Sequence, residues 1–263
     1  MPLHVEARGT GPPLVLLHGF TQTGRLWGPF GERLAVSRTV VAVDLPGHGG
    51  SGAVRADLPA SAALVAEAVR DTLGPAGEPC DLLGYSLGAR VALHVALGAG
   101  LALRRVVLIG ATAGIEDPVR RAQRRQADEA RADALEASGD VERFVSAWLR
   151  APMFSRLAAA GAAGAAERLR NSAPGLASSL RLCGTGTQEP LWDRLPSCPC
   201  PVLALAGTDD TAFAAHAVRL ARTVRQGVAS LVPGGGHAAH LAQPHQVARL
   251  VGHWLGAGGP DTD

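Results

Sequence analysis

Lysine is absent from this chain of 263 residues. Its 25 basic side chains are all arginines, and 23 acidic residues reduce the net charge to +2 at pH 7. Proteins that bind nucleic acid normally show a clustered excess of basic residues, so this balance argues against such a partner. Charged residues are also scarce at 18%, whereas 47% of the chain is hydrophobic. A chain of this length and composition can bury a large core, and we expect one globular unit.

Long apolar runs and a dense cysteine pattern are also missing. No apolar stretch reaches the roughly 18–20 residues that cross a bilayer, and residues 1–6 lack the pattern of a secretory signal peptide. We therefore expect a cytoplasmic protein without membrane insertion. Cys198 and Cys200 lack the spacing of a metal or redox motif. The four cysteines are expected to be reduced thiols: Cys80, Cys183, Cys198 and Cys200.

Short apolar runs alternate with segments of helical spacing, a pattern typical of a parallel sheet covered by helices on both faces. The predicted strands are 14–17, 39–43, 81–83, 106–109, 202–205 and 230–232. The predicted helices between them are 61–73, 87–97, 211–222 and 246–255.

The stretch 114–182 shows no strand pattern and is rich in arginine, alanine and glutamate. We expect several helices here, inserted between two core strands, with 1–113 and 183–263 forming the core. An insertion beside the carboxyl edge of a parallel sheet can act as a lid over a site. The alternative is a helical addition that does not contact a ligand.

A G-x-S-x-G motif at 84–88 follows a predicted strand and precedes a predicted helix. Glycines at these positions permit the sharp turn that presents a serine hydroxyl at a sheet edge, so Ser86 is the candidate for the reactive residue. The start of the next helix places unpaired amides and a positive dipole end beside it, which suits a developing anion.

A serine hydroxyl reacts only when a neighbouring imidazole takes its proton, and in this motif an acid and a histidine follow the serine in that order. Asp210 comes just after the strand at 202–205, and His237 follows the next strand through a run of glycines. Parallel strands place their sites at these carboxyl ends. The alternatives are Asp209 for the acid, and His240 or His245 for the base.

Stabilisation of an oxyanion needs a second backbone donor, which we place in the loop after the first predicted strand. The backbone amides of Phe20 and Leu87 form the predicted oxyanion hole, and His18 is expected to hold the loop. The glycine-rich turn at 44–51 lacks the G-x-x-x-x-G-K pattern of a phosphate-binding loop.

These features together resemble the α/β-hydrolase superfamily over almost the whole chain, which implies a mostly parallel sheet flanked by helices, with a helical lid. Three narrower segments are similar to 2-succinyl-6-hydroxy-2,4-cyclohexadiene-1-carboxylate synthases: GYSLGAR at 84–90, RAQRRQAD at 121–128 and GTGTQEPLW at 184–192. Ala89 departs from this family, which usually has glycine there. The resemblance implies substrate-binding roles for Tyr85, Arg90, Arg124, Trp148 and Arg168, with Arg125 or Arg170 as alternatives in the lid.

The resemblance also implies an activity. These synthases are lyases of menaquinone biosynthesis that eliminate pyruvate from 2-succinyl-5-enolpyruvyl-6-hydroxy-3-cyclohexene-1-carboxylate, with the triad acting as a base. Arginines suit this small tricarboxylate because guanidinium and carboxylate pair in a bidentate manner. No cofactor or metal is implied, and we expect a monomer or small homo-oligomer. A serine esterase or carbon–carbon bond hydrolase with the same triad is the alternative, and a non-catalytic receptor is a third hypothesis.

Overall fold

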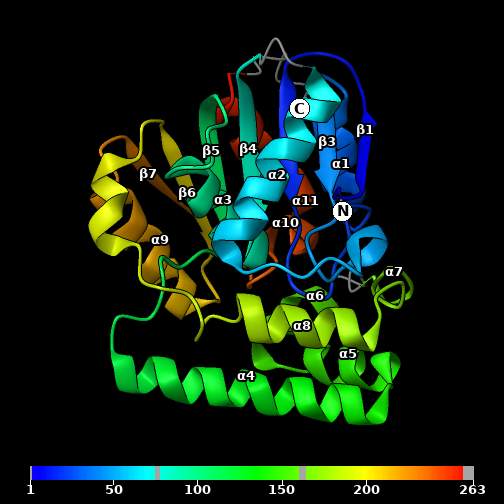
Figure 1. Cartoon of the computed structure of the whole chain (residues 1–263). Helices are drawn as coiled ribbons and strands as arrows, with labels where there is room; N and C mark the ends of the chain where they lie inside the picture. Colours follow the sequence, from blue (N-terminus) through cyan, green and yellow to red (C-terminus); the bar gives the residue numbers. More distant parts are fainter. Residues whose placement is uncertain (1, 75–77, 160–163, 257–263) are drawn as a thin grey trace.

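The computed structural model describes residues 2–74, 78–159 and 164–256. A seven-stranded sheet with the order β1-β3-β2-β4-β5-β6-β7 runs through the molecule (Figure 1). All neighbouring strands are parallel except β1, which pairs antiparallel with β3. The strands are β1 (Val5–Arg8), β2 (Pro13–Leu17), β3 (Thr39–Val43), β4 (Cys80–Tyr85), β5 (Leu103–Ile109), β6 (Val202–Gly207) and β7 (Gly227–Val232).

All six predicted strands are present, and the prediction of a mostly parallel α/β sheet is confirmed. The edge strand β1 was not predicted, because its sequence Val-Glu-Ala-Arg alternates apolar and polar side chains and lacks a continuous apolar run. Strands buried on both faces show such runs, whereas an edge strand does not need one.

Helices cover both faces of the sheet. The four predicted helices correspond to α2 (Leu58–Leu73), α3 (Leu87–Ala96), α9 (Thr211–Thr223) and α11 (Pro244–Trp254), and the short helices α1 (Gly28–Ala35) and α10 (Ala239–Ala242) were not predicted. Helix α2 begins three residues before its predicted start, because the Asp57 side chain accepts a hydrogen bond from the backbone amide of Ala60 and caps it.

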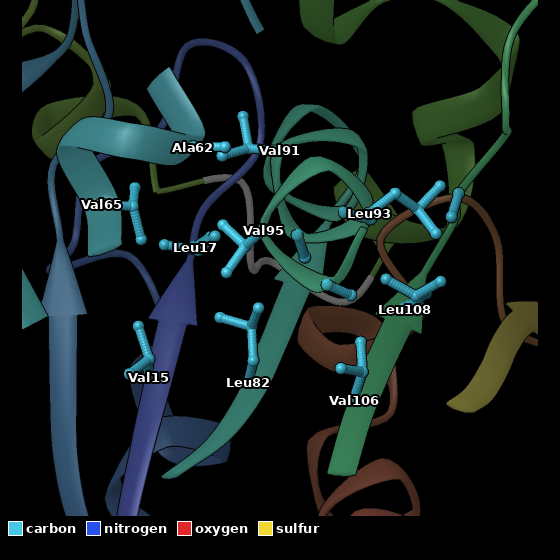
Figure 2. Close-up of a cluster of buried hydrophobic side chains, with 14 of the residues drawn as sticks. Val15, Leu17, Ala62, Val65, Leu82, Val91, Leu93, Val95, Val106 and Leu108 are labelled. Atoms are coloured by element: carbon cyan, nitrogen blue, oxygen red, sulfur yellow. The ribbon is translucent and has the colours of Figure 1, made fainter. Parts of the chain in front are cut away.

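Alternate residues of each central strand enter opposite halves of the core. In β2, Val15 and Leu17 belong to one buried cluster, whereas Leu14 and Leu16 belong to the other. Figure 2 shows the first cluster, with Val95 of α3 beside Leu17. Each such fully buried side chain contributes about 1.5–3 kcal/mol. This packing holds the carboxyl ends of the strands, and the loops that follow them, in fixed positions.

A layer of helices is inserted between β5 and β6. It consists of α4 (Pro118–Ser138), α5 (Val141–Leu149), η2 (Pro152–Phe154), α6 (Ser155–Ala159), α7 (Ala165–Arg168) and α8 (Ala173–Cys183), and we call it the lid. Figure 1 shows α4, α5 and α8 lying together below the sheet. Ala132 of α4 packs against Ala177 and Leu180 of α8, whereas most other side chains of α4 are exposed.

The two ends of the lid meet at one place. Leu191 N donates to Ala113 O at 2.7 Å, and Trp192 Nε1 donates to Gly114 O at 2.9 Å. The insertion therefore enters and leaves the core side by side. In the part of the chain described by the structure, no helix has the length and apolar character to cross a membrane.

Candidate active site

Ser86 lies in the turn between β4 and α3, with φ at 52° and ψ at −106°. A non-glycine residue rarely adopts positive φ, and such strain is typical of functional positions. The flanking glycines are required by space. A Cβ on Gly84 would lie 2.3 Å from Gly88 O, and one on Gly88 would lie 1.9 Å from Leu17 O. The turn thus presents Ser86 at the edge of the sheet, as the motif predicted.

Ser86, His237 and Asp210 form a continuous hydrogen-bonded chain. His237 Nε2 lies 3.0 Å from Ser86 Oγ, and His237 Nδ1 lies 2.7 Å from Asp210 Oδ2. Because the carboxylate can only accept, Nδ1 carries the proton and Nε2 is left to take one from the serine hydroxyl. The side chains of His237 and Asp210 are 2% and 9% exposed, so water competes little for these bonds.

The alternative residues make other contacts. Asp209 forms an ion pair with Arg156 of α6. His240 is fully buried with its ring 4.4 Å from that of Tyr85, and burial lowers its pKa to about 3. His245 is exposed at the start of α11. The geometry therefore favours Asp210 and His237 as the partners of Ser86.

Phe20 in the loop after β2 and Leu87 at the start of α3 both line the cavity described below, together with Ser86. Within the described part of the chain, neither the Phe20 amide nor the Leu87 amide donates to a protein acceptor. Two free donors beside a serine form the arrangement that stabilises an oxyanion.

Two buried histidines support this loop through their neutral rings. His18 Nδ1 donates to Gly19 O, and His18 Nε2 accepts from Leu45 N at 3.0 Å. In the same way His48 Nδ1 donates to Pro46 O, and His48 Nε2 accepts from Thr21 N. Burial lowers the pKa of His18 to about 4 and that of His48 to about 3. Each ring therefore remains an acceptor for a backbone amide at neutral pH.

We expect acid to destabilise the fold through these rings. The unfolded state binds a proton at His18 near pH 6.5, whereas the native state binds it near pH 4, so stability is lost as pH falls between these values. Between pH 7 and pH 5 the loss from His18 is roughly 2 kcal/mol. Urea unfolding of wild type and His18→Gln at both pH values should show a smaller loss in the variant. Equal losses in the two proteins would contradict the assignment.

A cavity of about 390 Å³ opens between the sheet edge and the lid. Helices α4, α5 and α8 contribute to its wall, together with residues that follow β4, β5 and β7. The predicted site residues in its lining are Phe20, Tyr85, Ser86, Leu87, Arg90, Arg124, Trp148 and His237. The methyl group of Ala89 lies in the core cluster and does not reach the cavity.

Arg90 is a buried cation in the cavity wall. Only 8% of the residue is exposed, and its Nη1 donates to Cys183 O at 2.6 Å. Among the described residues no carboxylate forms an ion pair with it, and burial lowers the pKa of its guanidinium to about 10. At neutral pH it is still charged, and a charge buried without a counter-ion is costly. An anionic ligand would supply the missing partner.

Two further charged residues of the cavity lining, Asp128 and Arg131, were not predicted. Asp128 is 1% exposed and accepts from Arg124 Nε at 2.9 Å and from Arg131 Nη1 at 3.2 Å. Their spacing of four and three residues places both arginines next to Asp128 on α4, and this spacing was the signal available in the sequence. With Arg90, the cavity lining thus contains three guanidinium groups and one carboxylate, which leaves an excess of positive charge.

The predicted residue Arg168 lies elsewhere. It is 2% exposed, does not line the cavity, and donates to Thr21 Oγ1 behind the Phe20 loop. Neither of the lid alternatives lines the cavity, since Arg125 is exposed on α4 and Arg170 pairs with Glu167. Sequence could not separate these arginines because only the fold shows which of them face the serine.

The cysteines take no part in a cluster of metal-ligand type. All four are buried and free, and Cys198 Sγ lies 3.9 Å from Cys200 Sγ. Among residues 2–74, 78–159 and 164–256, no group of three or more histidine, cysteine, aspartate or glutamate side chains is arranged to hold a metal ion.

Known proteins resemble this chain in sequence and in fold. The sequence model of the Alpha/beta hydrolase family matches residues 14–250. The chain is 33% identical to 2-succinyl-6-hydroxy-2,4-cyclohexadiene-1-carboxylate synthase of Salmonella schwarzengrund, with 92% of each chain covered. It is 28% identical to chloroplastic PHYLLO of Arabidopsis thaliana, of whose length it spans 16%, with 95% of this chain covered. The structure of MenH from S. aureus is similar, with a TM-score of 0.88, 28% identity and coverage of 97% and 98%.

Proposed function

The chain belongs to the Alpha/beta hydrolase family and, within it, to the 2-succinyl-6-hydroxy-2,4-cyclohexadiene-1-carboxylate synthases, and from this premise we propose how it acts. The protein is a lyase of menaquinone biosynthesis. It eliminates pyruvate from 2-succinyl-5-enolpyruvyl-6-hydroxy-3-cyclohexene-1-carboxylate. The observation that carries this conclusion is the Ser86–His237–Asp210 chain, which opens onto a cavity with an excess of guanidinium groups.

The proton transfers follow from the order of the hydrogen bonds. His237, oriented by Asp210, takes the proton of Ser86, and the serine oxygen removes a ring proton that conjugation with the succinyl carbonyl has made acidic. Negative charge moves to that carbonyl oxygen, where the amides of Phe20 and Leu87 stabilise it. The electron pair then forms the new ring double bond as the C–O bond to the enolpyruvyl group breaks. The departing enolate takes the proton held by His237 and becomes pyruvate, while Ser86 keeps the ring proton, so the triad returns to its starting state.

Substrate binding is the task of the arginines in the wall. Arg90 meets one carboxylate in a dry environment, where a charge-assisted pair is strongest. Arg124 uses its Nε for Asp128, so its terminal nitrogens are available to a second carboxylate. Tyr85 and Trp148 complete the wall around the ring. Trp148 Nε1 is buried and makes no hydrogen bond among the described residues, so it can donate to the substrate.

The charge of the cavity distinguishes this reaction from ester hydrolysis. A serine esterase can use the same triad and the same amides by attacking a carbonyl carbon. Such an enzyme has no general need for three arginines in the cavity lining, whereas an enzyme that binds a tricarboxylate does. We further propose that 114–182 acts as the lid of a core formed by 1–113 and 183–263. The cytoplasmic compartment and the monomeric or small oligomeric state stay predictions.

The decisive test supplies the enolpyruvyl substrate and follows pyruvate through a coupled lactate dehydrogenase reaction. Simple aryl esters are assayed in parallel. Release of one pyruvate for each substrate consumed supports the lyase. Rapid ester turnover without pyruvate release would favour the hydrolase.

Arg90→Gln is expected to raise the KM of pyruvate release by about 10–100-fold, with a smaller fall in kcat, because a charge-assisted pair contributes about 1.5–3 kcal/mol. The matched control is Arg120→Gln, which removes an exposed arginine of α4 that does not line the cavity. Steady-state kinetics at two salt concentrations measure both effects. An unchanged KM in Arg90→Gln would show that the substrate carboxylates bind elsewhere.

A further inference from the structure

Thr21, the residue after Phe20, has an unusual backbone conformation. Its φ is 65°, and apart from Ser86 no other non-glycine residue of the described chain has a positive φ. Gln22 N donates to Gly19 O at 3.0 Å, so Phe20 and Thr21 are the central residues of a tight turn. Turns with positive φ at the third position usually place glycine or asparagine there. A β-branched residue is a rare occupant that the surroundings must impose.

Three side chains from outside the turn hold every polar group of Thr21. Its amide donates to His48 Nε2, its hydroxyl accepts from Arg168 Nη1, and its carbonyl accepts from Asn171 Nδ2 at 2.8 Å. All four residues are at least nine-tenths buried. These three hydrogen bonds fix the backbone conformation of Thr21.

Asn171 connects this turn to two other segments. Its Nδ2 also donates to Arg168 O at 2.9 Å, and its Oδ1 accepts from Gly49 N at 2.9 Å. Beside it, Glu167 Oε1 accepts from Thr23 Oγ1. The end of α7 and the residues before α8 are therefore attached both to the Phe20 loop and to the turn at 44–51.

We propose that Asn171, together with Arg168, is a positioning residue that locks Thr21 in the left-handed conformation and so holds the Phe20 amide in the oxyanion hole. If Thr21 relaxed to a right-handed conformation, the turn from Gly19 to Gln22 would lose its shape, and the Phe20 amide within that turn would no longer be held in place. Arg168 thus acts through Thr21 on the reaction. This inference rests on the proposed role of the Phe20 amide.

Asn171→Ala is expected to lower kcat for pyruvate release by about 10–100-fold while KM changes by less than about threefold, because the lost alignment affects the transition state and not the carboxylate contacts. Asn171→Asp keeps the acceptor for Gly49 N but loses the donor to Thr21, and the same loss is expected. Leu169→Ala, which truncates an exposed side chain two residues away, is the matched control. Unchanged kcat in both Asn171 variants, or a rise in KM alone, would overturn the proposal.

Glycine at position 21 separates positioning from a general structural role. Glycine adopts positive φ without strain, so the Thr21→Gly variant depends less on Asn171 and Arg168 to keep this conformation. The kcat loss caused by Asn171→Ala should shrink to less than about threefold when it is measured between Thr21→Gly and the double variant. A loss of equal size in both backgrounds would assign Asn171 to stability alone, and thermal unfolding of each variant shows whether it is folded.

Phenylboronate tests the oxyanion hole without the native substrate. Ser86 Oγ adds to boron, its proton passes to His237, and one boron hydroxyl occupies the hole. Asn171→Ala should weaken phenylboronate binding by about tenfold, measured by calorimetry. If wild type binds phenylboronate but releases no pyruvate, the proposed function fails and the boronate affinities alone decide this inference. Equal affinities in wild type and Asn171→Ala would overturn it.

Discussion

Ser86→Ala is expected to reduce the rate of pyruvate release by at least about 10³-fold. Ser86, His237 and Asp210 act together, so the loss of one of them removes most of the rate enhancement that the three produce. Ser86 Oγ is the atom that links His237 Nε2 to the cavity. Without this oxygen, no group connects the imidazole of His237 to the proton of the substrate ring. Single-turnover measurement of pyruvate with excess enzyme gives the rate of the chemical step.

The variant should keep its affinity for the substrate, since the arginines of the wall are unchanged. Calorimetry with the substrate and Ser86→Ala measures this separately. Retention of most of the activity would show that His237 or another group removes the ring proton directly. In that case the serine-base mechanism would be wrong, although the carboxylate contacts could stand.

Asp210→Asn is expected to lower kcat by about 10³–10⁴-fold at neutral pH, a loss of the size found when the acid of a serine triad is replaced by its amide. The amide group would donate to His237 Nδ1 and move the imidazole proton to Nε2. The ring could then no longer accept the proton of Ser86.

Asp209→Asn provides the matched control, because this neighbouring carboxylate contacts Arg156 and not the imidazole. Its kcat should stay within about threefold of wild type. A large loss in Asp209→Asn together with a small one in Asp210→Asn would reverse the assignment of the acid.

The sequence predicted the residues whose role depends on their position directly after a strand. Ser86, Asp210 and His237 each follow a strand of the parallel sheet, and parallel strands bring their carboxyl ends to one edge. Their order and their strand contexts therefore predicted residues that the structure places within hydrogen-bond distance.

The lid was predicted less well because its contacts depend on how helices are rotated and packed. Arg124 faces the cavity, whereas Arg168 supports a loop behind it, and nothing in an arginine-rich segment separates the two. Asp128 could have been noticed from its spacing to Arg124 and Arg131. The contacts of Thr21 could not, since they join residues up to 150 positions apart in the sequence.

The junction at Ala113 and Leu191 has a consequence for how such enzymes can change. Hydrogen bonds connect the two ends of the inserted helices where they leave the core. The helices between these ends therefore form a cassette, a segment whose two ends lie side by side. A different helical segment inserted between these two residues would begin and end at the same hydrogen-bonded junction. New ligand preferences can then arise by exchange of the cassette, whereas Ser86, Asp210 and His237, which follow the core strands β4, β6 and β7, stay in place.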